Sequence, residues 1–184
     1  ITAMEEGVAT VAFSTGMAAI ATSFMSLLRS GDHIVSSAFL FGNTNSLFGT
    51  LENLGIEISY VDATDVAAVK NVTRENTKLV FVETIANPVT QVADLAAIGD
   101  FCKSENLIYV VDNTMTSPHL FLPKKVSASL VVNSLTKYIG GHGNALGGSI
   151  TDTGLFDWQS FDNIFENYKK EQPNLWGITQ IKKK

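Results

Sequence analysis

The chain is short of cysteine and of basic residues, and each shortage excludes a class of protein. Cys102 is the only cysteine among 184 residues, so a disulfide framework is excluded and the sequence predicts a protein of the reducing cytoplasm. Lys and Arg number 13 against 18 for Asp and Glu, which gives a formal net charge of -5 at pH 7. A nucleic-acid-binding surface needs a basic stripe, and the run Lys182–Lys184 is too short to form one. We therefore expect no nucleic-acid partner.

Long apolar runs and several signature motifs are missing as well. No run approaches the roughly 20 apolar residues that cross a bilayer, and no basic-then-apolar leader precedes the first expected helix. No histidine pair has the spacing of metal ligands, and no G-x-S-x-G motif of a serine hydrolase occurs. The glycines between positions 140 and 148 follow a lysine instead of preceding it, opposite to the order in a nucleotide-binding P-loop. These absences disfavour a membrane protein, a metal site and a Walker-type ATPase.

Apolar residues make up 45% of the chain, which at this length is enough for one full core and not for two comfortable domains. Runs of strand length, apolar on both faces, alternate with amphipathic stretches of helical length. The predicted strands are His33–Ser36, Ile56–Val61, Lys78–Glu83, Leu107–Asp112, Leu130–Asn133 and Gly148–Thr151. The predicted helices are Met17–Leu28, Thr44–Asn53, Val66–Val72, Leu95–Glu105 and Leu155–Lys169. This alternation predicts an α/β fold, a mostly parallel sheet flanked by helices, in one domain over residues 1–184.

Both ends of the sequence suggest a piece of a longer protein. Ile1 is not a methionine, and Ile1–Glu6 has the pattern of the tail of a helix. At the other end, the apolar residues of Asn174–Ile181 have no following element to pack on and no capping signal. We therefore expect the domain to be incomplete.

The segment Ser134–His142 places Lys137 between small hydroxyl side chains and a pair of glycines. A lysine amine that is partly neutral can condense with an aldehyde, and hydroxyls beside it suit a phosphate held close by. Pyridoxal 5'-phosphate is the phosphorylated aldehyde that enzymes tie to lysine in this way. The segment predicts a Schiff-base enzyme, with a surface lysine in a loop as the alternative.

Asp112 ends an apolar predicted strand, and the ligands of open α/β sheets gather outside the carboxyl ends of the strands. A carboxylate there can keep the pyridine nitrogen of the cofactor protonated, so that the ring withdraws electrons from the substrate. The alternative is a turn or helix cap, because Asp-Asn pairs favour turns. The sequence leaves both interpretations open.

A phosphate site is predicted where Ser14–Met17 precedes an apolar helix, since unpaired backbone N–H groups and the positive end of the helix dipole face whatever lies in front. Gly16 permits a close approach, and the amides of Gly16 and Met17 would donate to the phosphate. An ordinary Ser/Thr N-cap explains the same residues. Together with Ser134 and Thr136, however, the segment favours a phosphate.

Two loop residues complete the predicted site. Asn87 precedes a proline in a polar loop, where its amide can reach the phenolic oxygen of the cofactor, although a plain Asn-Pro turn is the alternative. Phe41 lies between a predicted strand and a predicted helix, where its ring can stack on a pyridine ring. The alternative for Phe41 is a place in the core, where most phenylalanines lie.

As an ordered set, these segments resemble the Cys/Met metabolism family of pyridoxal-phosphate enzymes, the group of cystathionine γ-synthase, cystathionine and methionine γ-lyases, and homoserine-ester sulfhydrylases. The resemblance covers nearly the whole chain and rests on Ser14–Ala19, Gly31–Val35, Phe41–Thr44, Glu83-Thr84 with Asn87-Pro88, Val111–Thr114 with Pro118, and Ser134–His142. It implies the large domain of the aspartate-aminotransferase-like fold, fold type I. It also implies an N-terminal segment and a C-terminal domain outside this sequence, and a homotetramer of dimers that share active sites.

The resemblance also implies roles for individual residues. Lys137 would carry the cofactor and act as the catalytic base, Asp112 would contact the ring nitrogen, and Phe41 would stack on the ring. The cofactor-binding set that it implies is Gly16, Met17, Phe41, Asn87, Asp112, Thr114, Ser134, Thr136 and Lys137.

Two departures from the family pattern bear on the reaction. Most of the family has tyrosine where this chain has Phe41, so the stack is kept while a hydroxyl implicated in proton transfer at the γ-leaving group is lost. The run Gly140–Asn144 is also closer to the O-acetylhomoserine sulfhydrylase type than to the lyases. Both favour γ-replacement on O-acetyl- or O-succinylhomoserine with sulfide or cysteine, giving homocysteine or cystathionine in methionine biosynthesis. The fragment alone is expected to be inactive.

Three alternatives stay open. The first is a cystathionine or methionine γ-lyase, and the second is a cofactor-binding or assembly module without turnover. The third is a hydrolase in which one of two serines pairs with a histidine; the candidates are Ser14, Ser149, His33, His119 and His142.

Overall fold

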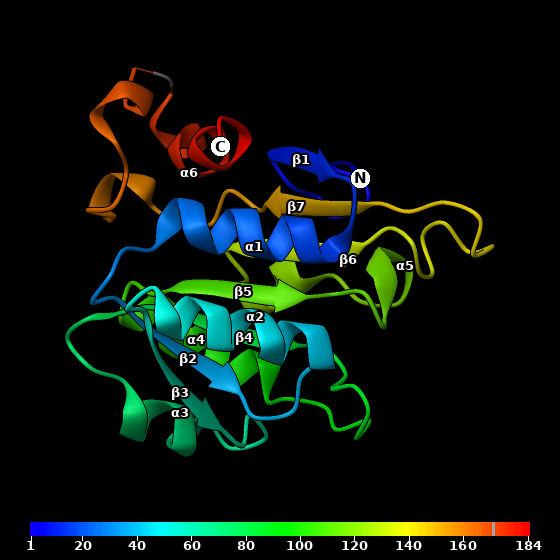
Figure 1. Cartoon of the computed structure of the whole chain (residues 1–184), viewed down its shortest axis with the longest axis horizontal. Helices are drawn as coiled ribbons and strands as arrows, with labels where there is room; N and C mark the ends of the chain where they lie inside the picture. Colours follow the sequence, from blue (N-terminus) through cyan, green and yellow to red (C-terminus); the bar gives the residue numbers. More distant parts are fainter. Residues whose placement is uncertain (171) are drawn as a thin grey trace.

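The computed structural model describes residues 1–170 and 172–184, and it contains a seven-stranded sheet covered by helices on both faces (Figure 1). The strands are β1 Ala9–Phe13, β2 His33–Ser37, β3 Glu57–Val61, β4 Thr77–Glu83, β5 Ile108–Asp112, β6 Leu130–Ser134 and β7 Gly148–Asp152. Their order across the sheet is β1-β7-β6-β5-β4-β2-β3. Strand β7 is antiparallel to both of its neighbours, and the other pairings are parallel. The predicted α/β fold with a mostly parallel sheet is confirmed.

Helices lie between most successive strands along the chain. They are α1 Gly16–Leu27, α2 Gly42–Asn53, α3 Val66–Val72, α4 Leu95–Ser104, α5 Ser117–Leu120 and α6 Trp176–Lys182, and the 3-10 turns are η1 Pro123–Val126, η2 Trp158–Ser160, η3 Glu166–Tyr168 and η4 Pro173–Leu175. Thr15, Asp65 and Asp94 accept hydrogen bonds from backbone N–H groups in the first turns of α1, α3 and α4. Each cap satisfies an otherwise orphaned donor and stabilises its helix by about 1 kcal/mol.

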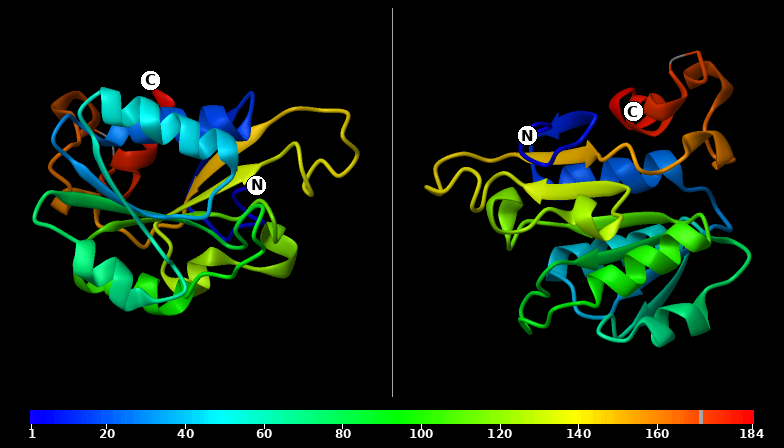
Figure 2. Two further views of the ribbon diagram at one scale, coloured as in Figure 1. Left: turned by 60° about the horizontal axis from the view of Figure 1, so that its bottom comes forward. Right: turned by 180° about the vertical axis from the view of Figure 1, so that it is seen from behind.

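Alternation along the central strands divides the core into two layers. In β4, Leu79 and Phe81 belong to the core under α1 and α2, whereas Val80 and Val82 belong to the core under α3 and α4. The left view of Figure 2 shows this arrangement, with α1 and α2 (blue and cyan) on one side of the sheet and α3 and α4 (green) on the other. The central strands need apolar residues on both faces, because the helices exclude water from both faces of the sheet.

Four parts of the fold differ from the predictions. Strand β1 was not predicted, and β7 is antiparallel, although its sequence resembles a buried parallel strand. Residues 174–181 do find packing partners: α6 lies against α1 and β1, and Ile178 and Ile181 are buried. Residues 1–6 form turns instead of the tail of a helix, because the buried Glu5 accepts hydrogen bonds from the side-chain amides of Asn113 and Asn133.

The predicted helix Leu155–Lys169 is wrong. The segment contains η2 and η3, and Phe156, Trp158 and Phe161 pack on the α1 side of the core instead of lying along a helix face. Its polar side chains bond to backbone groups in competition with a helix: Asp157 accepts from the Gln159 N–H, and Asn163 donates to the Leu27 carbonyl. Helical spacing of apolar residues alone did not reveal this competition.

The described residues include no helix that is both long and apolar enough to span a bilayer.

Buried His33, at the start of β2, is expected to make the stability of the sheet sensitive to acid. Its Nδ1 and Nε2 lie 2.7 Å and 2.9 Å from the hydroxyl oxygens of Thr77 and Ser59. Burial, with a smaller contribution from the Arg74 guanidinium, lowers the pKa of His33 below its usual value of 6.5. The unfolded state therefore binds this proton more readily. The stability that His33 contributes is present above pH 6.5 and is lost as the pH falls through the folded-state pKa.

Lowering the pH from 7.5 to 5.5 is expected to reduce the free energy of unfolding more in the wild type than in His33→Gln. The extra loss is at most about 1.4 kcal/mol per pH unit for one proton. The difference between variants is the relevant quantity, because burial raises the pKa of Glu83 and Asp152 and these carboxyls act in the opposite direction. Urea unfolding at both pH values measures it, with the exposed His119→Gln as control. Equal losses in wild type and His33→Gln would contradict the assignment.

Candidate active site

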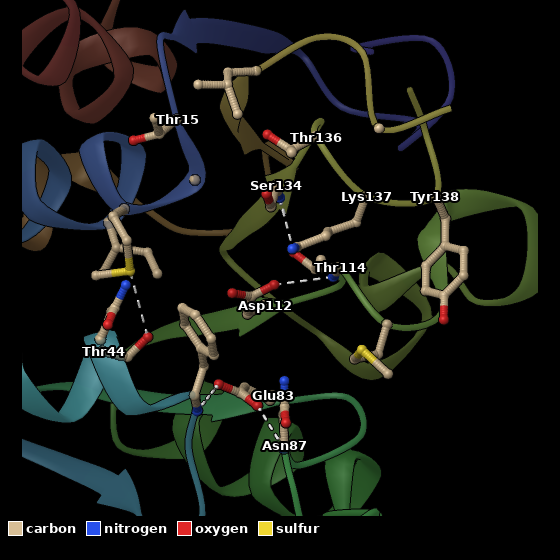
Figure 3. Close-up of a pocket in the computed structure, with 18 of the residues that line it drawn as sticks. Thr15, Thr44, Glu83, Asn87, Asp112, Thr114, Ser134, Thr136, Lys137 and Tyr138 are labelled. Atoms are coloured by element: carbon tan, nitrogen blue, oxygen red, sulfur yellow. Dashed lines mark hydrogen bonds between the residues drawn. The ribbon is translucent and has the colours of Figure 1, made fainter. Parts of the chain in front are cut away.

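A pocket of about 830 Å³ lies at the carboxyl edge of the parallel strands (Figure 3). The segments that follow β1, β2, β4, β5 and β6 all contribute to its lining. All nine residues of the predicted cofactor-binding set line it: Gly16, Met17, Phe41, Asn87, Asp112, Thr114, Ser134, Thr136 and Lys137. Segments up to 121 residues apart thus meet at one edge, because parallel strands direct their carboxyl ends the same way.

Lys137 lies in the turn that follows β6. Its backbone N–H donates to the Ser134 carbonyl at 3.1 Å, and its carbonyl accepts from the Gly141 N–H at 2.7 Å. The side chain is exposed and directed into the pocket (Figure 3). The turn fixes the backbone while the amine stays free to reach a ligand.

Asp112 ends β5, where it makes the bond expected of the turn interpretation, while its contact with a cofactor stays a prediction. Its Oδ1 accepts a hydrogen bond from the Thr114 N–H at 2.9 Å, which is the turn role, and the carboxylate also lines the pocket. Burial raises the pKa of Asp112, so a cationic group in the pocket would favour the ionised carboxylate. Thr114 Oγ1 in turn accepts from the Ser134 N–H at 2.8 Å and ties the ends of β5 and β6 together.

The N-terminus of α1 packs directly against the sheet. Thr15 Oγ1 caps the Ala18 N–H at 3.0 Å, as the N-cap interpretation expects. A Cβ on Gly16 would lie 2.8 Å from the Ser134 Cβ, and one on Gly148 would collide with the Thr15 carbonyl. Only glycine permits this approach, which leaves the first-turn amides of a 12-residue helix at the pocket wall. The site therefore offers anion-binding donors.

Thr136 is engaged with its own loop. Its hydroxyl donates to the Gly147 carbonyl at 3.3 Å and accepts from the Gly147 N–H at 3.1 Å, which closes the loop between β6 and β7. Thr136 lines the pocket from this position. Its contact with a phosphate stays a prediction.

Glu83 is a pocket residue that the sequence analysis did not single out. It is 6% exposed at the end of β4, next to Asp112 in the register of the sheet. Burial, with a further contribution from the Asp112 carboxylate, raises the pKa of Glu83 to about 7. The sequence signal that could have identified Glu83 is its position as a polar residue at the end of an apolar strand. Further lining residues outside the predicted set are Thr15, Ile20, Asn43, Thr44, Met115, Tyr138, Gly141, Gly143 and Leu146.

The hydrolase alternative finds little support in the geometry. His33 begins β2 at the opposite edge of the sheet from Ser14, which follows β1. Ser149 is buried within β7, and the exposed His142 bonds to the Gly140 carbonyl in its own loop. Within residues 1–170 and 172–184, no group of three or more His, Cys, Asp or Glu side chains is arranged to hold a metal ion.

Comparisons with known proteins give one family. The family model described as Cys/Met metabolism PLP-dependent enzyme matches residues 1–171. The O-acetyl-L-homoserine sulfhydrylase of Leptospira meyeri is 36% identical over 179 residues, which are 97% of this chain and 40% of that protein. The L-methionine gamma-lyase of Fusobacterium nucleatum subsp. polymorphum is 41% identical over 152 residues, which are 82% of this chain and 38% of that protein.

A solved structure extends the comparison to three dimensions. The O-acetylhomoserine sulfhydrylase of Wolinella succinogenes superposes with a TM-score of 0.90 at 38% identity, covering 100% of this chain and 52% of that one. The chain spans about 40% of the length of the curated relatives described above. The fold is thus the one predicted, the large domain of fold type I.

Proposed function

We propose that the complete protein catalyses γ-replacement on an activated homoserine ester. The premise is that this chain belongs to the Cys/Met metabolism family of PLP-dependent enzymes. The ester is O-acetyl- or O-succinylhomoserine, the incoming group is sulfide or cysteine, and the product is homocysteine or cystathionine. The expected cofactor is pyridoxal 5'-phosphate. In this proposal, residues 1–184 form the cofactor-binding large domain, and a C-terminal domain completes the substrate site.

The share of the chain that each match covers is the observation that favours γ-replacement over γ-elimination. The similarity to the sulfhydrylases of L. meyeri and W. succinogenes runs over 97% and 100% of the chain, whereas that to the F. nucleatum lyase covers 82%. Over its shorter span the lyase is the more similar, at 41% against 36% identity. γ-Elimination is therefore the second candidate.

The pocket suits a phosphorylated, positively charged ring. We expect the amides of Gly16 and Met17, with Ser134 and Thr136, to hold the phosphate, because Gly16 packs so closely on Ser134 that the helix terminus borders the pocket. The Asp112 carboxylate keeps one oxygen beyond its bond to Thr114 for the ring nitrogen. Phe41 and Asn87 line the remaining wall.

When bound, pyridoxal 5'-phosphate supplies an electron sink for the pair that remains when the substrate loses its α-proton. We expect the neutral Lys137 Nζ to remove that proton, to give it up, and only then to remove a proton from Cβ; Cα and Cβ are both reprotonated after the exchange at Cγ. The γ-acyloxy group then leaves as a carboxylate, and the thiol or sulfide takes its place at Cγ. Phe41 contributes an apolar ring without a hydroxyl, which suits a leaving group that needs little acid assistance.

Adding sulfide to the complete protein with O-acetylhomoserine is expected to divert product from 2-ketobutyrate to homocysteine. The reason is that γ-replacement needs the nucleophile, whereas γ-elimination releases ammonia and a keto acid without it. Both products are assayed with and without sulfide, and cysteine is tested in its place. An unchanged yield of 2-ketobutyrate in the presence of either thiol would identify a lyase and contradict the proposal.

The assembly is part of the same proposal. We propose a cytoplasmic homotetramer built from dimers that share active sites. Exposed apolar side chains at the pocket support a covering partner: Tyr138 and Leu146, both pocket-lining, are 63% and 76% exposed.

A further inference from the structure

The side chain of Glu83 connects two loops that come from different strands. Its Oε1 accepts a hydrogen bond from the Phe41 N–H at 2.7 Å, and its Oε2 accepts one from the Asn87 N–H at 3.1 Å (Figure 3). Phe41 follows β2, whereas Asn87 follows β4. Both bonds join a carboxylate to backbone donors, the class of hydrogen bond that is stronger than a neutral pair.

We propose that Glu83 is a positioning residue of the cofactor site, which sets the Phe41 ring and the Asn87 amide against the bound cofactor by holding both backbone N–H groups. The inference rests on cofactor binding in this pocket and not on which reaction follows. It assigns to Glu83 no contact with substrate and no proton transfer.

The other contacts of the two loops do not connect Phe41 with Asn87. Phe41 is the N-cap of α2 and makes no side-chain capping bond, its carbonyl accepts from the Thr44 N–H at 2.8 Å, and its side chain is 40% exposed. The loop after β4 is closed on itself by bonds between Ala86 and the pair Thr90 and Gln91. Phe41 and Asn87 are themselves at least partly exposed, although their neighbours Leu40 and Ala86 are buried, and the Glu83 carboxylate links the two residues directly.

A carboxylate in this position is costly, which argues against a merely structural role. Glu83 is almost fully buried, and the ionisable groups around it are Asp112 at the end of β5 and Lys137 and Tyr138 from the β6–β7 loop across the pocket. Burial first, and then Asp112, raises the pKa of Glu83 to about 7. The N-terminus of α2, with no acidic residue in its first turn, favours the negative charge. The hydrogen bonds from the two pocket walls, through the Phe41 and Asn87 N–H groups, offset part of this cost.

Glu83→Gln is the informative variant, because glutamine keeps the size of the side chain and has a single acceptor oxygen. Its NH2 group would face one of the two backbone N–H donors, so one loop must shift. Glu83→Asp keeps the charge but is one methylene too short to reach both donors. Glu57→Gln is the matched control, since Glu57 is an exposed carboxylate at the start of β3 that pairs with Arg74.

The test titrates pyridoxal 5'-phosphate into the apo form of the complete protein and follows the absorption band of the bound cofactor. At pH 8 we expect the Kd of Glu83→Gln and of Glu83→Asp to rise about tenfold, and that of Glu57→Gln to stay within twofold of the wild type. At pH 6 the ratio of the Glu83→Gln Kd to the wild-type Kd is expected to fall toward one, because Glu83 is then protonated in the wild type. Titration of the cofactor itself changes both Kd values by the same factor, so it cancels in the ratio.

The outcomes separate this inference from the proposed function. A wild-type protein that binds no cofactor would overturn both. Cofactor bound by wild type and Glu83→Gln with equal Kd at pH 8 would overturn the positioning role alone, even if the melting temperature of the apo variant falls. A Kd ratio that is the same at pH 6 and pH 8 would likewise assign Glu83 a structural role only.

Discussion

Lys137→Ala in the complete protein is expected to lower kcat by about 10³-fold or more. In the proposed function the Lys137 Nζ has two tasks, the covalent attachment of the cofactor and the removal of protons, and general acid–base catalysis alone typically contributes 10²–10⁴-fold. The fold should survive, because the side chain is exposed and only its backbone groups take part in the turn after β6. Steady-state kinetics with O-acetylhomoserine and sulfide measures the loss, and an unaltered melting temperature of the apo variant excludes misfolding.

Lys125→Ala is the control for this prediction. Lys125 is an exposed lysine in η1 and does not line the pocket, so its loss should leave kcat unchanged. Turnover by Lys137→Ala at the wild-type rate would remove the catalytic role of this residue.

Asp112→Asn is expected to lower kcat by about 10²-fold or more while the protein stays folded. Asparagine retains an oxygen that can accept from the Thr114 N–H, so the turn at the end of β5 is kept. It removes the negative charge that would stabilise a protonated ring nitrogen, and with it much of the electron withdrawal that assists loss of the α-proton. Burial raises the pKa of Asp112 in the absence of a cation, so the variant should not be less stable in the apo form.

The measurement is kcat at saturating cofactor and substrate, together with the melting temperature of the apo protein. Asp157→Asn is a suitable control, because Asp157 is an exposed cap of η2 outside the pocket. If Asp112→Asn keeps kcat within twofold of the wild type, the turn role is the only one left for this side chain.

Composition and periodicity predicted the central strands and their flanking helices because burial on both faces imposes a direct pattern. Strand β4 is apolar at successive positions, and such a run has few alternatives. The direction of β7 was not predictable in the same way, since an antiparallel and a parallel strand in a buried position have the same pattern. Its direction follows from the β6–β7 connection, whose ends pair Ser134 with Gly148.

The site was predicted where a chemical group had an identifiable task of its own. Lys137 and Asp112 carry reactive groups in segments of marked sequence, and both line the pocket. Glu83 lay in a segment used for the family resemblance, yet its individual position was missed because its partners are backbone N–H groups of Phe41 and Asn87. Backbone donors from distant loops leave no trace in side-chain sequence, and only the tertiary structure brings them to one carboxylate.

The most direct test of the account is to identify the amine that holds the cofactor. The complete protein is loaded with pyridoxal 5'-phosphate, reduced with borohydride, digested and mapped by mass spectrometry. We expect a pyridoxyl group on the peptide that contains Lys137. A label on any other lysine, or no label on protein that was incubated with excess cofactor, would contradict it.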